Sequence, residues 1–100
     1  MARSPVILLA NRTLPNVDAI ATTLESGLSD IVEFLPSDSN QATLAIAIGG
    51  DGTLINHGRV LSAQGIPLIG VNSGRLGFLA KFDAQSLIEH RASIFTDDTP

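Results

Sequence analysis

Short apolar runs alternate along this chain with stretches of helical spacing, and that alternation constrains the fold more than any other feature. Each run has the length of one strand, and continuous apolar strands separated by helices are typical of a parallel sheet covered on both faces. We therefore predict an α/β fold with a Rossmann-like, mostly parallel sheet flanked by helices. The four runs are Val6–Ala10, Ile31–Leu35, Leu44–Ile48 and Pro67–Val71.

The first helical stretch lies between the first two runs. Asn16 is a suitable N-cap for it, and Gly27 lies near its expected end. Its apolar side chains recur at intervals that place them on one face of a helix. They are Val17, Ile20, Ala21, Leu24 and Leu28.

Two more helices complete the pattern. One is predicted from near Thr53 to about Gln64, with Gly65 as the C′ residue that ends it. Its face toward the sheet carries Leu54, Ile55 and Leu61. The other is predicted over Asp83–Phe95. The order is β-α-β-β-α-β-α, and we expect residues 1–100 to form a single small domain.

Composition excludes several classes of partner and site. The 100 residues are 44% hydrophobic, which is enough for a compact core, and the formal net charge is −4. Six scattered basic residues argue against nucleic acid or an anionic membrane as the main partner. The absence of cysteine excludes a disulfide framework and a thiolate metal site. No apolar stretch approaches the roughly 20 residues that cross a bilayer, and we expect a soluble, cytoplasmic protein.

The third apolar run stops at a glycine-rich sequence, Gly49–Thr53 (GGDGT), directly before a predicted helix. Ligands of open α/β sheets bind at the carboxyl ends of strands. Glycine allows close approach of the backbone, and a helix N-terminus offers free N–H groups to an anion. The segment therefore predicts a phosphate-binding loop, although it is neither a Walker A loop nor the G-x-G-x-x-G fingerprint.

Asp51 is the unusual member of this loop, because a carboxylate repels phosphate unless it has another task. It could accept a proton as a general base, or help to hold a Mg²⁺ ion that bridges phosphates. A structural interpretation stays open, since Asp-Gly is a common turn and aspartate is a good N-cap.

A second glycine-rich loop, Asn72–Gly77, follows the fourth run. Two loops at neighbouring strand ends would line one crevice. Asn72 and Phe78 are its candidate ligand contacts, with turn formation and core packing as the alternatives. His57 is expected at the surface. It has no partner with metal-ligand spacing, so we predict no protein metal centre there.

The two loops together resemble the NAD kinase family. A strand ending in GGDGT, a helix, and a strand leading into Gly70–Leu79 (GVNSGRLGFL) match its N-terminal GGDG domain. Diacylglycerol and sphingosine kinases also carry GGDGT, but their second motif, built around G-T-G-N-D, is absent here. A fragment of such a lipid kinase is one alternative, and a catalytically inactive nucleotide-binding module is another.

The resemblance implies transfer of a phosphoryl group from ATP, or polyphosphate, to the 2′-hydroxyl of the adenosine ribose of NAD, with a divalent ion such as Mg²⁺. It makes Asp51 the proton acceptor. It places Arg59 at an arginine that is common in the following helix. Many relatives have a basic residue five positions after the catalytic aspartate, where this chain has Asn56. The cofactor-binding set carried over is Gly49, Gly50, Gly52, Thr53, Asn56, Asn72 and Phe78.

The family implies more chain than these 100 residues. NAD kinases have a second, β-rich domain that completes the NAD pocket and through which they assemble as homo-oligomers. The resemblance therefore implies a fragment or truncated chain that holds part of the site.

Overall fold

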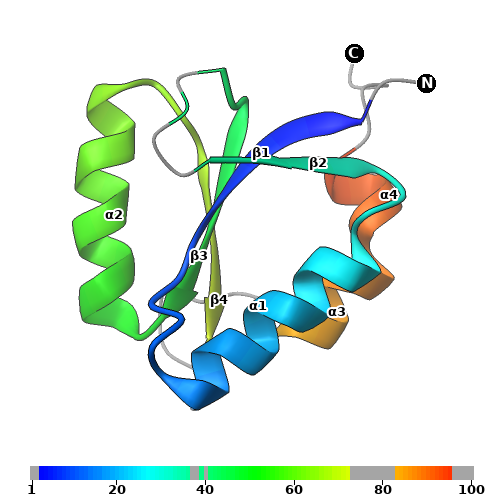
Figure 1. Ribbon diagram of the computed structural model, residues 1–100. Coiled ribbons are helices and arrows are strands. Elements are labelled where there is room, and N and C mark those ends of the chain that lie inside the picture. Colours follow the sequence, from blue (N-terminus) through cyan, green and yellow to red (C-terminus); the bar gives the residue numbers. More distant parts are fainter. Residues whose placement is uncertain (1–2, 37–38, 40, 73–82, 96–100) are drawn as a thin grey trace.

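The structure, a computed structural model, describes residues 3–36, 39, 41–72 and 83–95. In this part of the chain four parallel strands form one sheet in the order β2-β1-β3-β4 (Figure 1). The predicted α/β fold class is thus confirmed. The elements are β1 (Ser4–Leu9), α1 (Pro15–Gly27), β2 (Val32–Leu35), β3 (Leu44–Gly49), α2 (Asp51–Ala63), β4 (Leu68–Asn72), α3 (Ala84–Glu89) and α4 (Arg91–Ile94).

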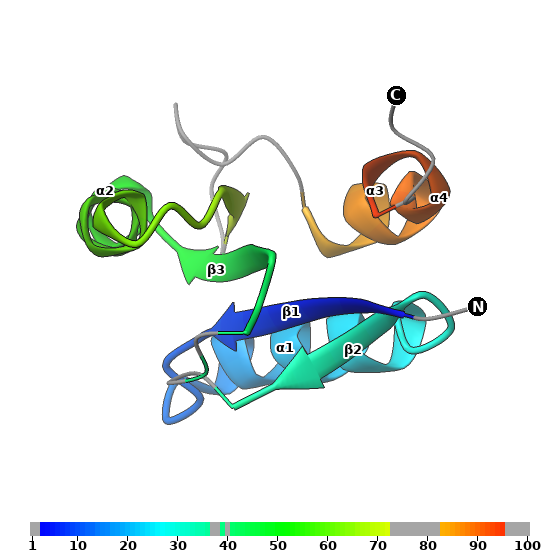
Figure 2. The ribbon, with the colours of Figure 1, turned by 90° about the horizontal axis from the view of Figure 1, so that it is seen from above.

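Side-chain size differs between the two faces of the sheet. In β3, Ile46 and Ile48 join the larger core under α1 and α3, whereas Ala45 and Ala47 face α2. Figure 2 shows α2 and the α3–α4 pair on opposite sides of β3. Alternate residues of a strand point to opposite faces, so apolar strands can fill both layers. The larger core contains Val6, Val17, Ala21, Leu24, Leu28, Val32, Ile46, Ile48, Val71, Leu87 and Phe95.

Helix α1 begins earlier than its expected N-cap. Leu14 is the N-cap and Pro15 the first helical residue, so the prediction of Asn16 as N-cap was wrong. Proline suits the first helical position because its φ is already helical and its missing N–H would have no partner there. The helix ends at Gly27, where a Cβ atom would lie 2.4 Å from Cδ1 of Ile88 on α3. Glycine therefore allows α1 and α3 to approach closely.

Helix α2 ends as predicted at a left-handed glycine. Gly65 has φ +74°. Its N–H donates to the Ser62 carbonyl at 3.1 Å, and the Ile66 N–H donates to the Leu61 carbonyl at 3.0 Å. This is a Schellman motif, in which glycine carries no steric penalty for positive φ.

The last helical stretch is two helices rather than one. His90, with φ −102° and ψ 15°, separates α3 from α4, and the prediction of a continuous helix over 83–95 was wrong. The turn places Phe95 in the core and brings Arg91 to Asp30, with 3.1 Å between Nε and Oδ2. At the start of α3, Asp83 accepts from the Ser86 N–H at 2.8 Å. Hydrogen bonds from Ser86 lower the pKa of the Asp83 carboxyl.

Candidate functional site

The strand order creates a crevice at the carboxyl ends of β1 and β3. The chain leaves β1 through α1 to reach β2 on one side, and leaves β3 through α2 to reach β4 on the other. Connections that diverge from adjacent strands in this way form a topological switch point, where open α/β sheets bind their ligands. The GGDGT sequence lies at this point, because β3 ends at Gly49 and α2 begins at Asp51.

Among the described residues, no side chain caps the N-terminus of α2. Its N-cap is Gly50, which has no side chain, whereas α3 is capped by the Asp83 carboxylate. The first hydrogen bond of α2 runs from the Leu54 N–H to the Gly50 carbonyl at 3.0 Å. N–H groups of the first helical turn have no partner within a helix, and the helix dipole adds partial positive charge there. This end of α2 is thus chemically suited to an anion such as a phosphate.

The glycines of this loop differ in what they do for the fold. A Cβ atom on Gly49 would lie 2.9 Å from Cβ of Thr53, so Gly49 is required for packing within the chain. A Cβ atom on Gly50 or Gly52 would meet no described atom within 4 Å, and neither residue has positive φ. Neither packing nor backbone conformation therefore accounts for these two glycines. Relative to the described residues, both leave space that a ligand could approach closely.

Asn72 lies beside the GGDGT sequence. It is the last residue of β4 and pairs with Gly49 across the parallel ladder. The sequence placed Asn72 in a loop, and that boundary was wrong because the ladder with β3 extends one residue further than the apolar run. Phe78 and the rest of the second motif lie outside the described residues. For Asp51 the structure describes the backbone, at the first position of α2.

Other candidates lie along α2. Thr53 and Asn56 are exposed, as is Arg59. Ile55 was expected to face the sheet, but 53% of it is exposed, because Leu54 and Leu61 fill the sheet-facing side. His57 was expected at the surface and is instead half-buried. The sequence did not predict that His57 lies beside the end of β1, because that position depends on the order of the strands in the sheet.

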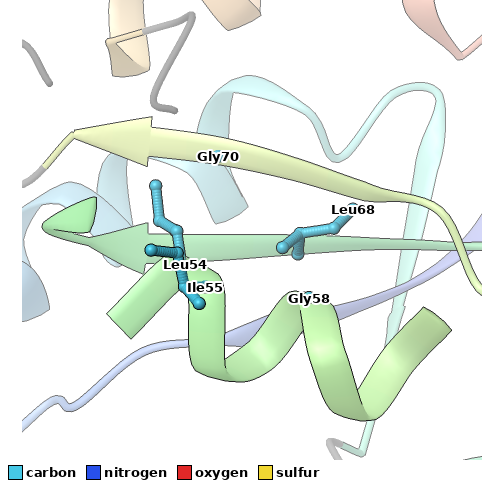
Figure 3. Close-up of a pocket in the computed structure, with 5 residues that line it drawn as sticks. All are labelled: Leu54, Ile55, Gly58, Leu68 and Gly70. Atoms are coloured by element: carbon cyan, nitrogen blue, oxygen red, sulfur yellow. The ribbon is translucent and has the colours of Figure 1, made fainter. Parts of the chain in front are cut away.

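Two pockets flank α2 in the described part of the chain. On the β4 side, a pocket of about 280 Å³ is lined by Leu54, Ile55, Gly58, Leu68 and Gly70, and none of these described residues has a polar side chain (Figure 3). On the β1 side, a pocket of about 320 Å³ is lined by Leu8, Leu9, Ala10, Asn11 and His57. We call the latter the β1–His57 pocket. Among the described residues, it differs from the first pocket in having polar side chains, Asn11 and His57, in its wall.

Arg12, the described basic residue that follows β1, is held by ion pairs. Arg12, which follows β1, donates from Nε to Asp18 at 2.8 Å, from Nη1 to Glu25 at 3.0 Å and from Nη2 to Thr22 at 3.0 Å. The bonds to Asp18 and Glu25 raise the pKa of the Arg12 guanidinium. The side chain is held against α1 and is not directed to the GGDGT loop. Among the described residues, no three His, Asp or Glu side chains gather into a metal-binding group.

The described helices include none with the length and apolar character needed to cross a membrane.

Comparison with known proteins identifies NAD kinases among the relatives of this chain. The chain is 40% identical over 62 residues to the NAD kinase of Methylococcus capsulatus, an alignment that covers 62% of this chain and 21% of that protein. It is 43% identical over 67 residues to the NAD kinase of Haemophilus influenzae, covering 67% of this chain and 23% of that protein. The chain thus spans about a fifth of the length of these relatives.

A solved structure has the same fold. The NAD kinase of Archaeoglobus fulgidus, in complex with ATP, superimposes with a TM-score of 0.56 at 24% identity, covering 93% of this chain and 37% of that one. Residues 8–99 match the ATP-NAD kinase N-terminal domain. Because this match covers most of the chain, the chain belongs to the NAD kinase family.

Proposed function

We propose that this domain supplies the catalytic-base side of an NAD kinase site, at the carboxyl edge of β3. The reaction is ATP + NAD → ADP + NADP. The observation that carries the proposal is the position of GGDGT, at the topological switch point and at the uncapped start of α2. Membership of the family supports the same reaction. The matched relatives are NAD kinases, which favours this proposal over a lipid kinase fragment.

The proposed step is a displacement at the terminal phosphorus of ATP. The 2′-oxygen of the adenosine ribose of NAD forms a bond to that phosphorus, the bond to the bridging oxygen breaks, and ADP leaves. Asp51 accepts the proton of the 2′-hydroxyl. Phosphoryl transfer depends mainly on alignment and on stabilising charge. The free N–H groups at the start of α2 would align a phosphate that contacts Gly50 and Gly52, and they would also stabilise its charge.

In this proposal the divalent ion binds together with the nucleotide. Mg²⁺ in such sites is commonly held by one or two carboxylates together with substrate phosphates. Asp51 is the carboxylate that the chain places at the phosphate loop. Such an ion would neutralise charge on the transferred phosphoryl group. Polyphosphate is a second donor with the same terminal chemistry.

The remaining assignments complete the proposal. Gly49, Thr53, Asn56, Asn72 and Phe78 contribute to the nucleotide site around Gly50 and Gly52. Asn72 is supported by its pairing with Gly49, and Asn56 by its exposed position on α2. The full-length protein acts in the cytoplasm as a homo-oligomer, and residues 1–100 form its N-terminal nucleotide-binding domain.

A second candidate is nucleotide binding without turnover. It is supported by the fold shared with an NAD kinase that was solved in complex with ATP. In this case the domain binds ATP but the remaining part of the NAD pocket is needed for chemistry.

The test is NADP formation from NAD, ATP and Mg²⁺ by the wild-type chain and by Asp51→Asn, with ATP binding measured on both. Turnover that the substitution abolishes, with ATP binding retained, supports the kinase proposal. ATP binding without turnover in either protein supports the second candidate. Absence of ATP binding, or turnover that Asp51→Asn leaves unchanged, contradicts the proposed roles.

A further inference from the structure

We propose that the β1–His57 pocket receives the adenine base of the nucleotide whose phosphates lie at Gly50–Gly52. This inference rests on the proposed function, because it assumes a nucleotide at this edge of the sheet. It adds a contact for the base, made by Asn11 and His57, to the phosphate contacts already described.

The pocket and the phosphate loop open at the same edge of adjacent strands. Leu9 of β1 pairs with Ala47 of β3, and two residues further along each segment come Asn11 and Gly49. His57 approaches from α2, six residues beyond Asp51. That separation is about 9 Å along the helix axis, close to the length of a nucleoside. Helical side chains lean toward the N-terminus, which directs His57 toward the loop.

The chemistry of the pocket suits a flat heterocycle better than a phosphate. Its apolar walls are Leu8, Leu9 and Ala10, and none of the described residues that line it is charged. A phosphate there would lose its water without gaining a cation. A base would gain apolar contacts on its faces, and the His57 imidazole can stack on it.

The polar groups of the pocket are available to orient a base. Asn11 Oδ1 accepts from the N–H of Thr13 at 3.2 Å and from its hydroxyl at 2.5 Å, which fixes the amide. Within the described part of the chain, the Asn11 NH₂ and both ring nitrogens of His57 have no hydrogen-bond partner. An amide NH₂ is a suitable donor to an adenine ring nitrogen. The three bonds of Arg12 hold the turn that carries Asn11 against α1.

The volume of the β1–His57 pocket, and its difference from the pocket on the β4 side, also favour an adenine base as its ligand. A volume of about 320 Å³ lies at the lower end of the range for ligand pockets, which suits one base rather than a dinucleotide. Among the described residues, the pocket on the β4 side has no polar side chain in its lining, so only backbone atoms could orient a base there (Figure 3).

The test uses the imidazole NMR signals, because the chain has two histidines. His90 is an internal control, since its Nδ1 contacts the Ser86 carbonyl at 2.9 Å on the other side of the sheet. Adenosine 5′-monophosphate is expected to shift the ring signals of His57 and not those of His90. Inorganic tripolyphosphate is expected to shift the backbone amides of Gly50–Gly52 and leave His57 unchanged. His57→Gln assigns the two sets of signals.

A substitution gives a second measurement. His57→Ala is expected to weaken ATP binding by about tenfold, the loss of one base contact, and to leave tripolyphosphate binding unchanged. Ser62→Ala, an exposed position on the same helix, is expected to change neither.

The outcomes separate this inference from the proposed function. Loop amides that respond to the monophosphate while His57 does not would overturn the base pocket alone. A His57 shift reproduced by tripolyphosphate would mean that the pocket binds phosphate, which also overturns it. No response of either the loop or His57 to the monophosphate or to ATP would overturn both proposals.

Discussion

Gly52→Ala is expected to raise stability and weaken nucleotide binding at the same time. A Cβ atom at this position meets none of the described atoms within 4 Å, so we expect the fold to accommodate alanine. Replacing glycine by alanine in a helix stabilises it by about 0.5 kcal/mol or more. For a domain of this size, that gain corresponds to a rise in Tm of about 2–4 °C.

The same methyl group occupies the space that we assign to the ligand. It holds a phosphate away from the first-turn N–H groups of α2. Loss of one charge-assisted hydrogen bond weakens binding by about tenfold or more. Thermal unfolding followed by circular dichroism measures the first effect, and calorimetric titration with ATP measures the second.

Gly58→Ala is the matched control on the same helix. Its Cβ atom would lie 3.7 Å from Cδ2 of Leu68, an ordinary contact. It should therefore stabilise the domain by up to about 1 kcal/mol and leave ATP binding unchanged. Unaltered ATP affinity in Gly52→Ala would refute the argument that this glycine is kept open for a ligand. A lowered Tm in Gly52→Ala would contradict the open space in the structure.

Two further predictions concern stability. Gly65→Ala is expected to lower the free energy of unfolding by about 1 kcal/mol or more, because φ of +74° is unfavourable for alanine, and urea unfolding checks this; an unchanged midpoint would argue against the Schellman turn. Asp83→Ala is expected to destabilise the domain at neutral pH. Because the folded-state pKa of Asp83 is lowered from 3.8, the stabilisation is present above that value and is lost as the pH falls through the folded pKa. Urea unfolding at several pH values should show the mutant and wild type converging in acid, and a gap independent of pH would contradict this.

Local chemistry predicted the best-defined parts of the fold. The predicted ends of α2 were correct to within two residues. The end of the apolar run before Gly49 and the left-handed C′ residue Gly65 are both local signals in the sequence. The α/β class followed from the alternation of runs and helices. The resemblance to NAD kinases depended on two motifs and needed no tertiary structure.

Features that depend on tertiary contacts could not be predicted. Helix α1 begins at Pro15, so Asn16 is a helical residue and not the N-cap. The break at His90 depends on where Phe95 and Asp30 lie, far away in sequence. The position of His57 beside β1 required the strand order β2-β1-β3-β4, which hydrophobic pattern does not specify. The candidate base pocket therefore became visible only in three dimensions.

The central claim is that nucleotide binds at the carboxyl edge of the sheet, around the start of α2. Backbone amide NMR shifts on addition of ATP and Mg²⁺ test it directly. We predict that Gly50–Thr53 and Asn72 respond, while Ser4 and Val32, which pair at the amino ends of β1 and β2, do not. Shifts concentrated at Ser4 and Val32, with the start of α2 unchanged, would contradict the account.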